Sequence, residues 1–217
     1  MKRRSAEFVL VLFSVPTIML ALLASLVKRG NDVLFINGHH SIFLDFFFSF
    51  ITALGEGLLF IPIFIASLFI QYRYSVLTLL VWIAHSGVCQ FLKRGLFSDV
   101  LRPISVLDKS RLHFVPHIEV HGLYSFPSGH TATIFCLAML AALFIGRKVP
   151  AIIFLMVALL VGYSRIYLLQ HFLIDVAGGA VIGTALTYTL WKLFHRSTLP
   201  RWMKGSLTNP LPTLSSN

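Results

Sequence analysis

Residues 164–175 read SRIYLLQHFLID and place the polar side chains of Ser164, Arg165, His171 and Asp175 in a largely apolar run. His171 and Asp175 are four residues apart, so on a helix they would share one face, one turn from each other. A carboxylate there can accept the Nδ1 proton of the imidazole and leave Nε2 free as a nucleophile or base. Arg165 lies just upstream, and arginine binds phosphate through two donors at once. Because charges inside an apolar segment are costly, the pattern favours a functional site over a merely structural pairing between helices.

The whole chain has the composition of a membrane protein. Of its 217 residues, 57% are hydrophobic and only 12% are charged, and its mean hydropathy is +0.83. A soluble domain has about 25% charged residues. We therefore predict an all-α fold, a polytopic bundle of six transmembrane helices at about residues 6–27, 42–70, 75–92, 128–145, 151–167 and 171–194. The first is too long for the apolar part of a signal peptide, which predicts an uncleaved helix.

Six spans predict a single integral membrane domain over residues 1–200 and a polar cytoplasmic tail over residues 201–217. Ten of the 18 Lys and Arg residues fall on the side of the termini and eight on the other side. The eight become five if Lys93, Arg102 and Arg165 belong to an active site. This excess predicts cytoplasmic termini, with the loop 93–125 on the outer side of the membrane.

The net charge of +10 does not indicate a nucleic-acid partner, because the basic residues are spread among loops and segment ends. Anionic lipid head groups suit such a surface better. Cys89 and Cys136 lie in apolar segments, so we interpret them as small buried side chains rather than a disulfide. Glu56 interrupts the second predicted span; it could line a polar cavity, but we place it at the water interface.

A second polar motif, SFPSGHT at residues 125–131, opens the fourth predicted span. Ser128 is typical of a helix cap, and Gly129 lets a ligand approach the backbone. The free N–H groups at such a helix start bind anions. His130 can donate a proton to a leaving oxygen, while Lys93 and Arg102 add positive charge on the same predicted side of the membrane.

Together these stretches resemble the type 2 phosphatidic acid phosphatase (PAP2) superfamily over about residues 75–190. Its signature is Lys-x6-Arg-Pro, then Pro-Ser-Gly-His, then Ser-Arg-x5-His-x3-Asp. The second and third parts match at residues 127–130 and 164–175. The first departs, because eight residues separate Lys93 from Arg102 and seven separate Arg94 from Arg102. We assign the basic position to Lys93, with two extra residues bulged out, and Arg94 is the alternative.

The resemblance implies a lipid phosphatase that needs neither a metal nor a cofactor. His171 would attack phosphorus and form a phosphohistidine, Asp175 would orient its imidazole, and His130 would protonate the leaving lipid oxygen and then activate water. The phosphate would be held by Lys93, Arg102, Ser128, Gly129 and Arg165. The remaining histidine groups, His39-His40 and the series His113, His117 and His121, are interpreted as solvated loop residues rather than metal ligands.

Several functions share these motifs. The resemblance to small bacterial members implies a protein of the cell inner membrane whose site faces the periplasm, and it favours as substrate lipid A of lipopolysaccharide, at its 1- or 4′-phosphate. The alternatives are undecaprenyl diphosphate, phosphatidylglycerophosphate, phosphatidic acid, and transfer of the phosphate to a second lipid. A soluble vanadium haloperoxidase is disfavoured by the apolar spans. An anion or lipid transporter is disfavoured because transport does not require His171 and Asp175 beside a second histidine, and no internal repeat is present. The sequence does not predict an oligomeric state.

Overall fold

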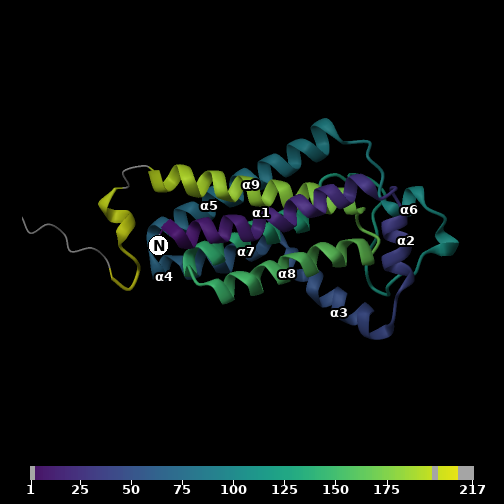
Figure 1. Cartoon of the computed structure of the whole chain (residues 1–217), viewed down its shortest axis with the longest axis horizontal. Helices are drawn as coiled ribbons and strands as arrows, with labels where there is room; N and C mark the ends of the chain where they lie inside the picture. The colour runs from purple at the N-terminus through teal and green to yellow at the C-terminus, as the bar shows by residue number, and fades with distance from the viewer. Residues whose placement is uncertain (1–2, 197–199, 210–217) are drawn as a thin grey trace, which may run out of the picture.

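The computed structural model describes residues 3–196 and 200–209, which form an elongated helical bundle with no strand in those ranges (Figure 1). The all-α prediction is confirmed. The helices are α1 (Arg3–Leu26), α2 (Asn31–Gly38), α3 (Ile42–Thr52), α4 (Phe60–Ile70), α5 (Tyr72–Phe91), α6 (Pro103–Val106), α7 (Gly129–Ile145), α8 (Lys148–Tyr167) and α9 (Leu173–Arg196). Shorter turns are η1 (Ala53–Gly55), η2 (Gly57–Leu59), the π-helical η3 (Leu92–Leu96), η4 (Lys109–Arg111) and η5 (Arg201–Lys204).

Helix α7 is the centre of the bundle. Helices α1, α5, α8 and α9 all contact it, and nearly every side chain from Thr131 to Leu143 is buried. A helix that is apolar on all sides is stable only when it is surrounded in this way. Helix α9 approaches it most closely near Gly179, where a Cβ atom would lie 2.5 Å from the carbonyl oxygen of Ser128. Close packing therefore joins the start of α7 to the first half of α9.

Six full-length membrane spans are not seen. Within the described residues, four helical segments are long and apolar enough to cross a membrane: Ser5–Leu26, Tyr72–Leu96, Lys148–Tyr167 and Leu173–His195. A fifth is counted if α2 and α3, bent by 120°, are one broken span. The predicted fourth span is α7, whose 17 residues are fewer than the roughly 20 that a bilayer core requires. The chain is a multi-pass membrane protein with four or five candidate spans.

The predicted second span is broken in the middle. Helix α3 ends at Thr52, and η1 and η2 separate it from α4. Glu56 has an extended backbone between these two turns, flanked by Gly55 and Gly57, which disfavour a continuous helix. The break therefore places a charged side chain that is 57% exposed in the middle of the predicted span.

The two ends of the described chain lie together. Figure 1 shows the N-terminus and the segment 200–209 at one end of the bundle and α2 and α6 at the other. Residues 201–209 pack on the junction of α4 and α5, where Gly205 accepts from the Tyr72 amide and the Leu207 amide donates to Leu68. The remainder of the predicted tail, residues 210–217, lies outside the described residues.

Candidate active site

A polar cavity of about 360 Å³ opens where the end of α5, the start of α7 and the end of α8 meet. It is lined by six of the eight residues that the sequence predicts for the site: Lys93, Arg102, Gly129, His130, Arg165 and His171. The other two, Ser128 and Asp175, lie directly behind this lining and are completely buried. The structure therefore brings all three motifs together around one space.

Hydrogen bonds of Ser128 and Asp175 join the motif at residues 125–131 to the motif at residues 164–175. Ser128 caps α7 by accepting from the Thr131 amide, and its own amide donates to the carbonyl oxygen of Asp175 over 2.9 Å. The Asp175 carboxylate accepts from the Ser125 hydroxyl at 2.5 Å and from the Phe172 amide at 2.9 Å. The Ser128 hydroxyl also lies 2.8 Å from the hydroxyl of Thr131. Both side chains are engaged inside the protein and hold the cavity wall in register.

His171 does not lie on a helix with Asp175, contrary to the prediction. Helix α8 ends at Tyr167, α9 begins at Leu173, and the intervening turn contains Leu169 at a φ of 59°. The amides of Gln170 and His171 both donate to the carbonyl oxygen of Arg165, which closes the turn. This turn presents the His171 ring to the cavity while Asp175 remains within reach in the first turn of α9.

His171 is 1% exposed, and its Nδ1 lies 3.5 Å from Asp175 Oδ2. This separation exceeds that of an ordinary hydrogen bond, so the interaction is electrostatic in this state. Burial, followed by the positive charges of Arg102, Arg165 and Lys93, holds the pKa of His171 well below its ordinary value. The ring is therefore neutral near pH 7, which is the form in which an imidazole nitrogen can act as a nucleophile.

Two buried guanidinium groups face the cavity. Arg165 donates from Nη1 to the Thr52 hydroxyl at 2.6 Å, and its Nε has no hydrogen-bond partner among the described residues. Arg102 donates from Nε to the Leu123 carbonyl and from Nη1 to Gln170 Oε1, over 2.9 and 2.8 Å. These hydrogen bonds use only some of the N–H donors of each guanidinium group, so the remaining donors are available to an anion.

The first motif departs from the family spacing where the helix changes its geometry. Helix α5 gives way to the π-helical η3, which contains both Lys93 and Arg94. Lys93 lines the cavity, and its Nζ lies 3.9 Å from where a Cβ of Gly129 would stand. Arg94 is exposed and does not contribute to the lining. This arrangement supports Lys93 as the phosphate ligand.

Replacing Lys93 with alanine is expected to lower kcat/KM for phosphate release by about 10²-fold, because a cation is removed from the anion site. Arg94→Ala is the matched control at the neighbouring position, and we expect less than about a twofold change because exposed charges are screened by solvent. Phosphate release by the two purified variants, measured side by side, checks the assignment. A larger loss in Arg94→Ala would assign the basic position of the first motif to Arg94 instead of Lys93.

Several residues of the cavity were not predicted. Thr52 and Glu56 reach it from the break between α3 and α4, although Glu56 was placed at the water interface. Gln170 donates to the backbone oxygen of Glu119 at 2.7 Å and so connects Arg102 to the loop that carries His117 and His121. These two histidines are exposed, as predicted for a solvated loop, and they also line the cavity. The sequence signal that could have identified Glu56 as a cavity residue is its position as a charged residue inside an apolar segment.

Helix α2 holds this end of the bundle in place. The buried Asp32 carboxylate accepts from the Leu173 amide at the start of α9, and Asn37 bonds both the amide and the carbonyl of His113. His113 Nε2 lies 2.9 Å from Asp45 of α3, which is also bonded to the Tyr167 hydroxyl. Within residues 3–196 and 200–209, no three or more His, Cys, Asp or Glu side chains are grouped as a metal site would require.

Comparison with protein families gives a match over more than half of the chain. The family model described as the PAP2 superfamily matches residues 74–199, which include all eight predicted site residues. Thr52 and Glu56 lie outside the matched range. The motif-bearing part of the chain and the family model therefore coincide, and the first four helices lie upstream of the match.

Individual relatives are more distant. The chain is 34% identical over 91 residues to phosphatidylglycerophosphatase B of Bacillus subtilis, covering 38% of this chain but only 44% of that protein. It is 27% identical over 176 residues to a lipid A 4′-phosphatase of Bacteroides thetaiotaomicron, covering 76% of each. The alignment with the Bacillus protein thus spans less than half of that relative.

Two crystal structures share the fold. Aquifex aeolicus LpxE matches with a TM-score of 0.64 and 28% identity, covering 74% of this chain and 92% of that one. A PAP2-type phosphatidylglycerolphosphate phosphatase from Bacillus subtilis matches with a TM-score of 0.60 and 23% identity, covering 89% and 98%.

Proposed function

The chain belongs to the PAP2 superfamily of membrane lipid phosphatases, and we propose that it hydrolyses a phosphate of lipid A through a phosphohistidine intermediate. The observation that carries the proposal is the single cavity in which His130 and His171 face three cationic side chains, Lys93, Arg102 and Arg165. Positive groups fixed around a phosphate stabilise the charge that develops during phosphoryl transfer.

The mechanism divides the work between the two histidines. His171 attacks phosphorus through Nε2, and the Asp175 carboxylate behind it stabilises the imidazolium character of the intermediate. His130 gives a proton to the departing lipid oxygen, then accepts a proton from the water that hydrolyses the phosphohistidine. Lys93, Arg102, Arg165 and the backbone of Gly129 at the start of α7 hold the phosphate oxygens in both steps, and Ser128 holds that helix start in place from behind the cavity lining.

An apolar groove beside the cavity supports a lipid substrate. It has a volume of about 200 Å³, its lining side chains are all apolar, and it includes Leu54 of η1 and Ile134 of α7. Leu54 is two residues from Glu56, and Ile134 is about one helical turn from His130. A lipid whose phosphate occupies the cavity has an apolar surface immediately next to it for an acyl chain.

The proposed orientation places the cavity on the periplasmic side of a cell inner membrane and both termini in the cytoplasm. One support is the excess of Lys and Arg on the side of the termini. The other is that the termini lie at the opposite end of the bundle from α2 and α6. That orientation gives the cavity access to lipids of the outer leaflet.

The choice of lipid A rests on the Bacteroides relative, which covers most of the chain and is named for the 4′-phosphate. Phosphatidylglycerophosphate is the second candidate, because the Bacillus relative is more similar over a shorter stretch. Both substrates are phosphate monoesters, and the same residues would act on either.

A panel of lipids in detergent tests this proposal. The full-length protein is incubated with lipid A, phosphatidylglycerophosphate, undecaprenyl diphosphate and phosphatidic acid, and released phosphate is measured. We expect lipid A to be hydrolysed fastest, with mass spectrometry identifying whether the 1- or 4′-phosphate is lost. Faster release from phosphatidylglycerophosphate would replace lipid A as the substrate. Label transferred to an added second lipid, without free phosphate, would show a phosphotransferase.

A further inference from the structure

The break between α3 and α4 brings a carboxylate against the second histidine of the cavity. Glu56 Oε1 lies 3.0 Å from Nε2 of His130. The backbone of Glu56 is extended, with φ −67° and ψ 134°, and it is held between η1 and η2. This residue precedes the range that the PAP2 family model matches, so the family motifs do not account for it.

Close packing fixes the approach of this carboxylate. A Cβ atom on Gly55 would lie 2.8 Å from the Cβ of His130 and 3.1 Å from its Cδ2. The backbone of the break therefore rests on the ring edge that contains Cδ2 and Nε2, and any side chain at residue 55 would displace the ring. Because Nε2 is bonded to Glu56, Nδ1 is the ring nitrogen available to a substrate.

The charges around His130 make such a partner useful. Lys93 from η3, Arg102 from the segment before α6, and Arg165 from α8 all line the same cavity, with His171 opposite and His117, Glu119 and His121 on the adjoining loop. A general acid must hold its proton before the reaction, but burial, followed by the positive charges of Arg165 and Lys93, lowers the pKa of His130 to about 4. The Glu56 carboxylate acts against this shift. The Glu56 carboxylate is the one acidic side chain that the structure shows bonded to the ring within the described residues.

We propose that Glu56 is a positioning residue for His130, which orients the imidazole with Nδ1 toward the leaving oxygen and favours the protonated ring in the first step. This inference rests on the proposed function. In the first step the bond from phosphorus to the lipid oxygen breaks, the bond from phosphorus to His171 Nε2 forms, and the Nδ1 proton of His130 moves to the lipid oxygen. In the second step water supplies the new oxygen on phosphorus, its proton returns to Nδ1, and the bond to His171 breaks.

Glu56→Gln tests the proposal, because glutamine keeps the hydrogen-bond acceptor and removes the charge. We compare the long-chain lipid of the panel that the wild type hydrolyses fastest with p-nitrophenyl phosphate, whose leaving group departs without a proton. The expected kcat for the lipid falls by about 10-fold, whereas kcat for p-nitrophenyl phosphate changes by less than about twofold. The alkaline limb of kcat/KM for the lipid should move to lower pH, since His130 then loses its proton more easily.

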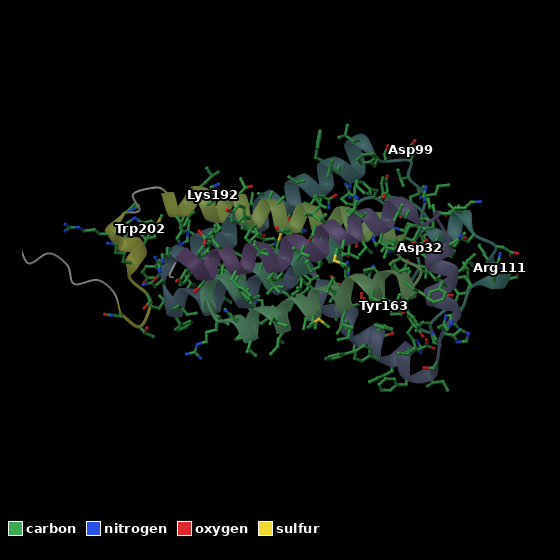
Figure 2. All side chains as sticks on the ribbon, in the orientation of Figure 1. Asp32, Asp99, Arg111, Tyr163, Lys192 and Trp202 are labelled. Atoms are coloured by element: carbon green, nitrogen blue, oxygen red, sulfur yellow. The ribbon has the colours of Figure 1, made fainter. Side chains whose placement is uncertain are left out.

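The controls separate this role from a structural one. Asp99→Asn removes one negative charge from an exposed turn at the same end of the bundle (Figure 2) and should leave rates and pH profile unchanged. Glu56→Asp restores the charge and should recover the wild-type pH profile. If Glu56→Gln lost the same activity on both substrates, or left the alkaline limb unshifted, the inference about Glu56 would be overturned. The proposed function would still stand as long as His171→Ala is inactive. Activity in His171→Ala would instead overturn the proposed function itself.

Discussion

Replacing His171 with alanine is expected to abolish phosphate release, with turnover falling by about 10⁴-fold or more. The substitution removes the nucleophile, and no other side chain of the cavity can take the phosphoryl group from the same position. Lys93, Arg102 and Arg165 would still bind the phosphate, so binding of the lipid should persist. Phosphate release by the purified variant, measured with the panel of lipids, checks the expected loss.

The fold should survive this substitution. The Asp175 carboxylate keeps its bonds to the Ser125 hydroxyl and the Phe172 amide, which do not depend on the histidine. His171 is buried, so the lost packing should cost about 1–3 kcal/mol, which a thermal unfolding curve detects. His39→Ala, at an exposed histidine of the same end of the bundle, is the matched control and should keep full activity.

A labelled intermediate distinguishes the covalent mechanism from direct attack by water. The wild type, quenched during turnover of a radiolabelled lipid, should carry acid-labile phosphate, and His171→Ala should carry none. Partial activity in His171→Ala, with the same fold, would mean that water attacks phosphorus directly and would refute the phosphohistidine.

The sequence was most informative where chemistry constrains residue type. The motifs at residues 127–130 and 164–175 predicted the PAP2 family, and the family match confirms it. Together with the first motif they named six residues that line one cavity, although Lys93 and His171 are 78 positions apart in the sequence. Residue identity and order were sufficient here, because a phosphate site requires a small set of cations and histidines.

Hydropathy was less informative about which apolar segments cross the membrane. Helix α7 and the segment around Glu56 are both strongly apolar, like the four candidate spans. However, α7 is a short helix at the centre of the bundle, and the segment around Glu56 is broken by turns. Local composition does not distinguish a helix that faces lipid from one that faces other helices. The six-span prediction failed to allow for this difference.

The unpredicted part of the site comes from the first 73 residues. Thr52 holds Arg165, Glu56 holds His130, and Asp32 caps the start of α9. These contacts join residues more than 70 positions apart, so no local pattern marks them. They also explain why α2 and the α3–α4 break belong to the catalytic unit, although the family match begins only at residue 74.

Replacing Arg165 with lysine is expected to lower kcat/KM by about 10²-fold and replacing it with alanine by about 10³-fold. Arg165 is 7% exposed and uses Nη1 to bind Thr52, while its Nε has no hydrogen-bond partner among the described residues. Lysine is a point charge without the planar fork of arginine, so it cannot bind Thr52 and two phosphate oxygens in fixed directions. The conservative replacement should therefore still be severe.

Thr52→Val and Arg111→Lys complete this experiment. Valine at residue 52 keeps the side-chain shape but removes the acceptor for Nη1, and we expect a loss of about 10-fold, smaller than that of Arg165→Lys, because the guanidinium remains. Arg111, an exposed arginine of η4, should tolerate lysine without change. Rates are measured for each variant on the same lipid, with thermal unfolding as the check on folding. If Arg165→Lys kept most of the wild-type kcat/KM, positive charge alone would be sufficient at this position, and oriented binding by the guanidinium would no longer be part of the mechanism.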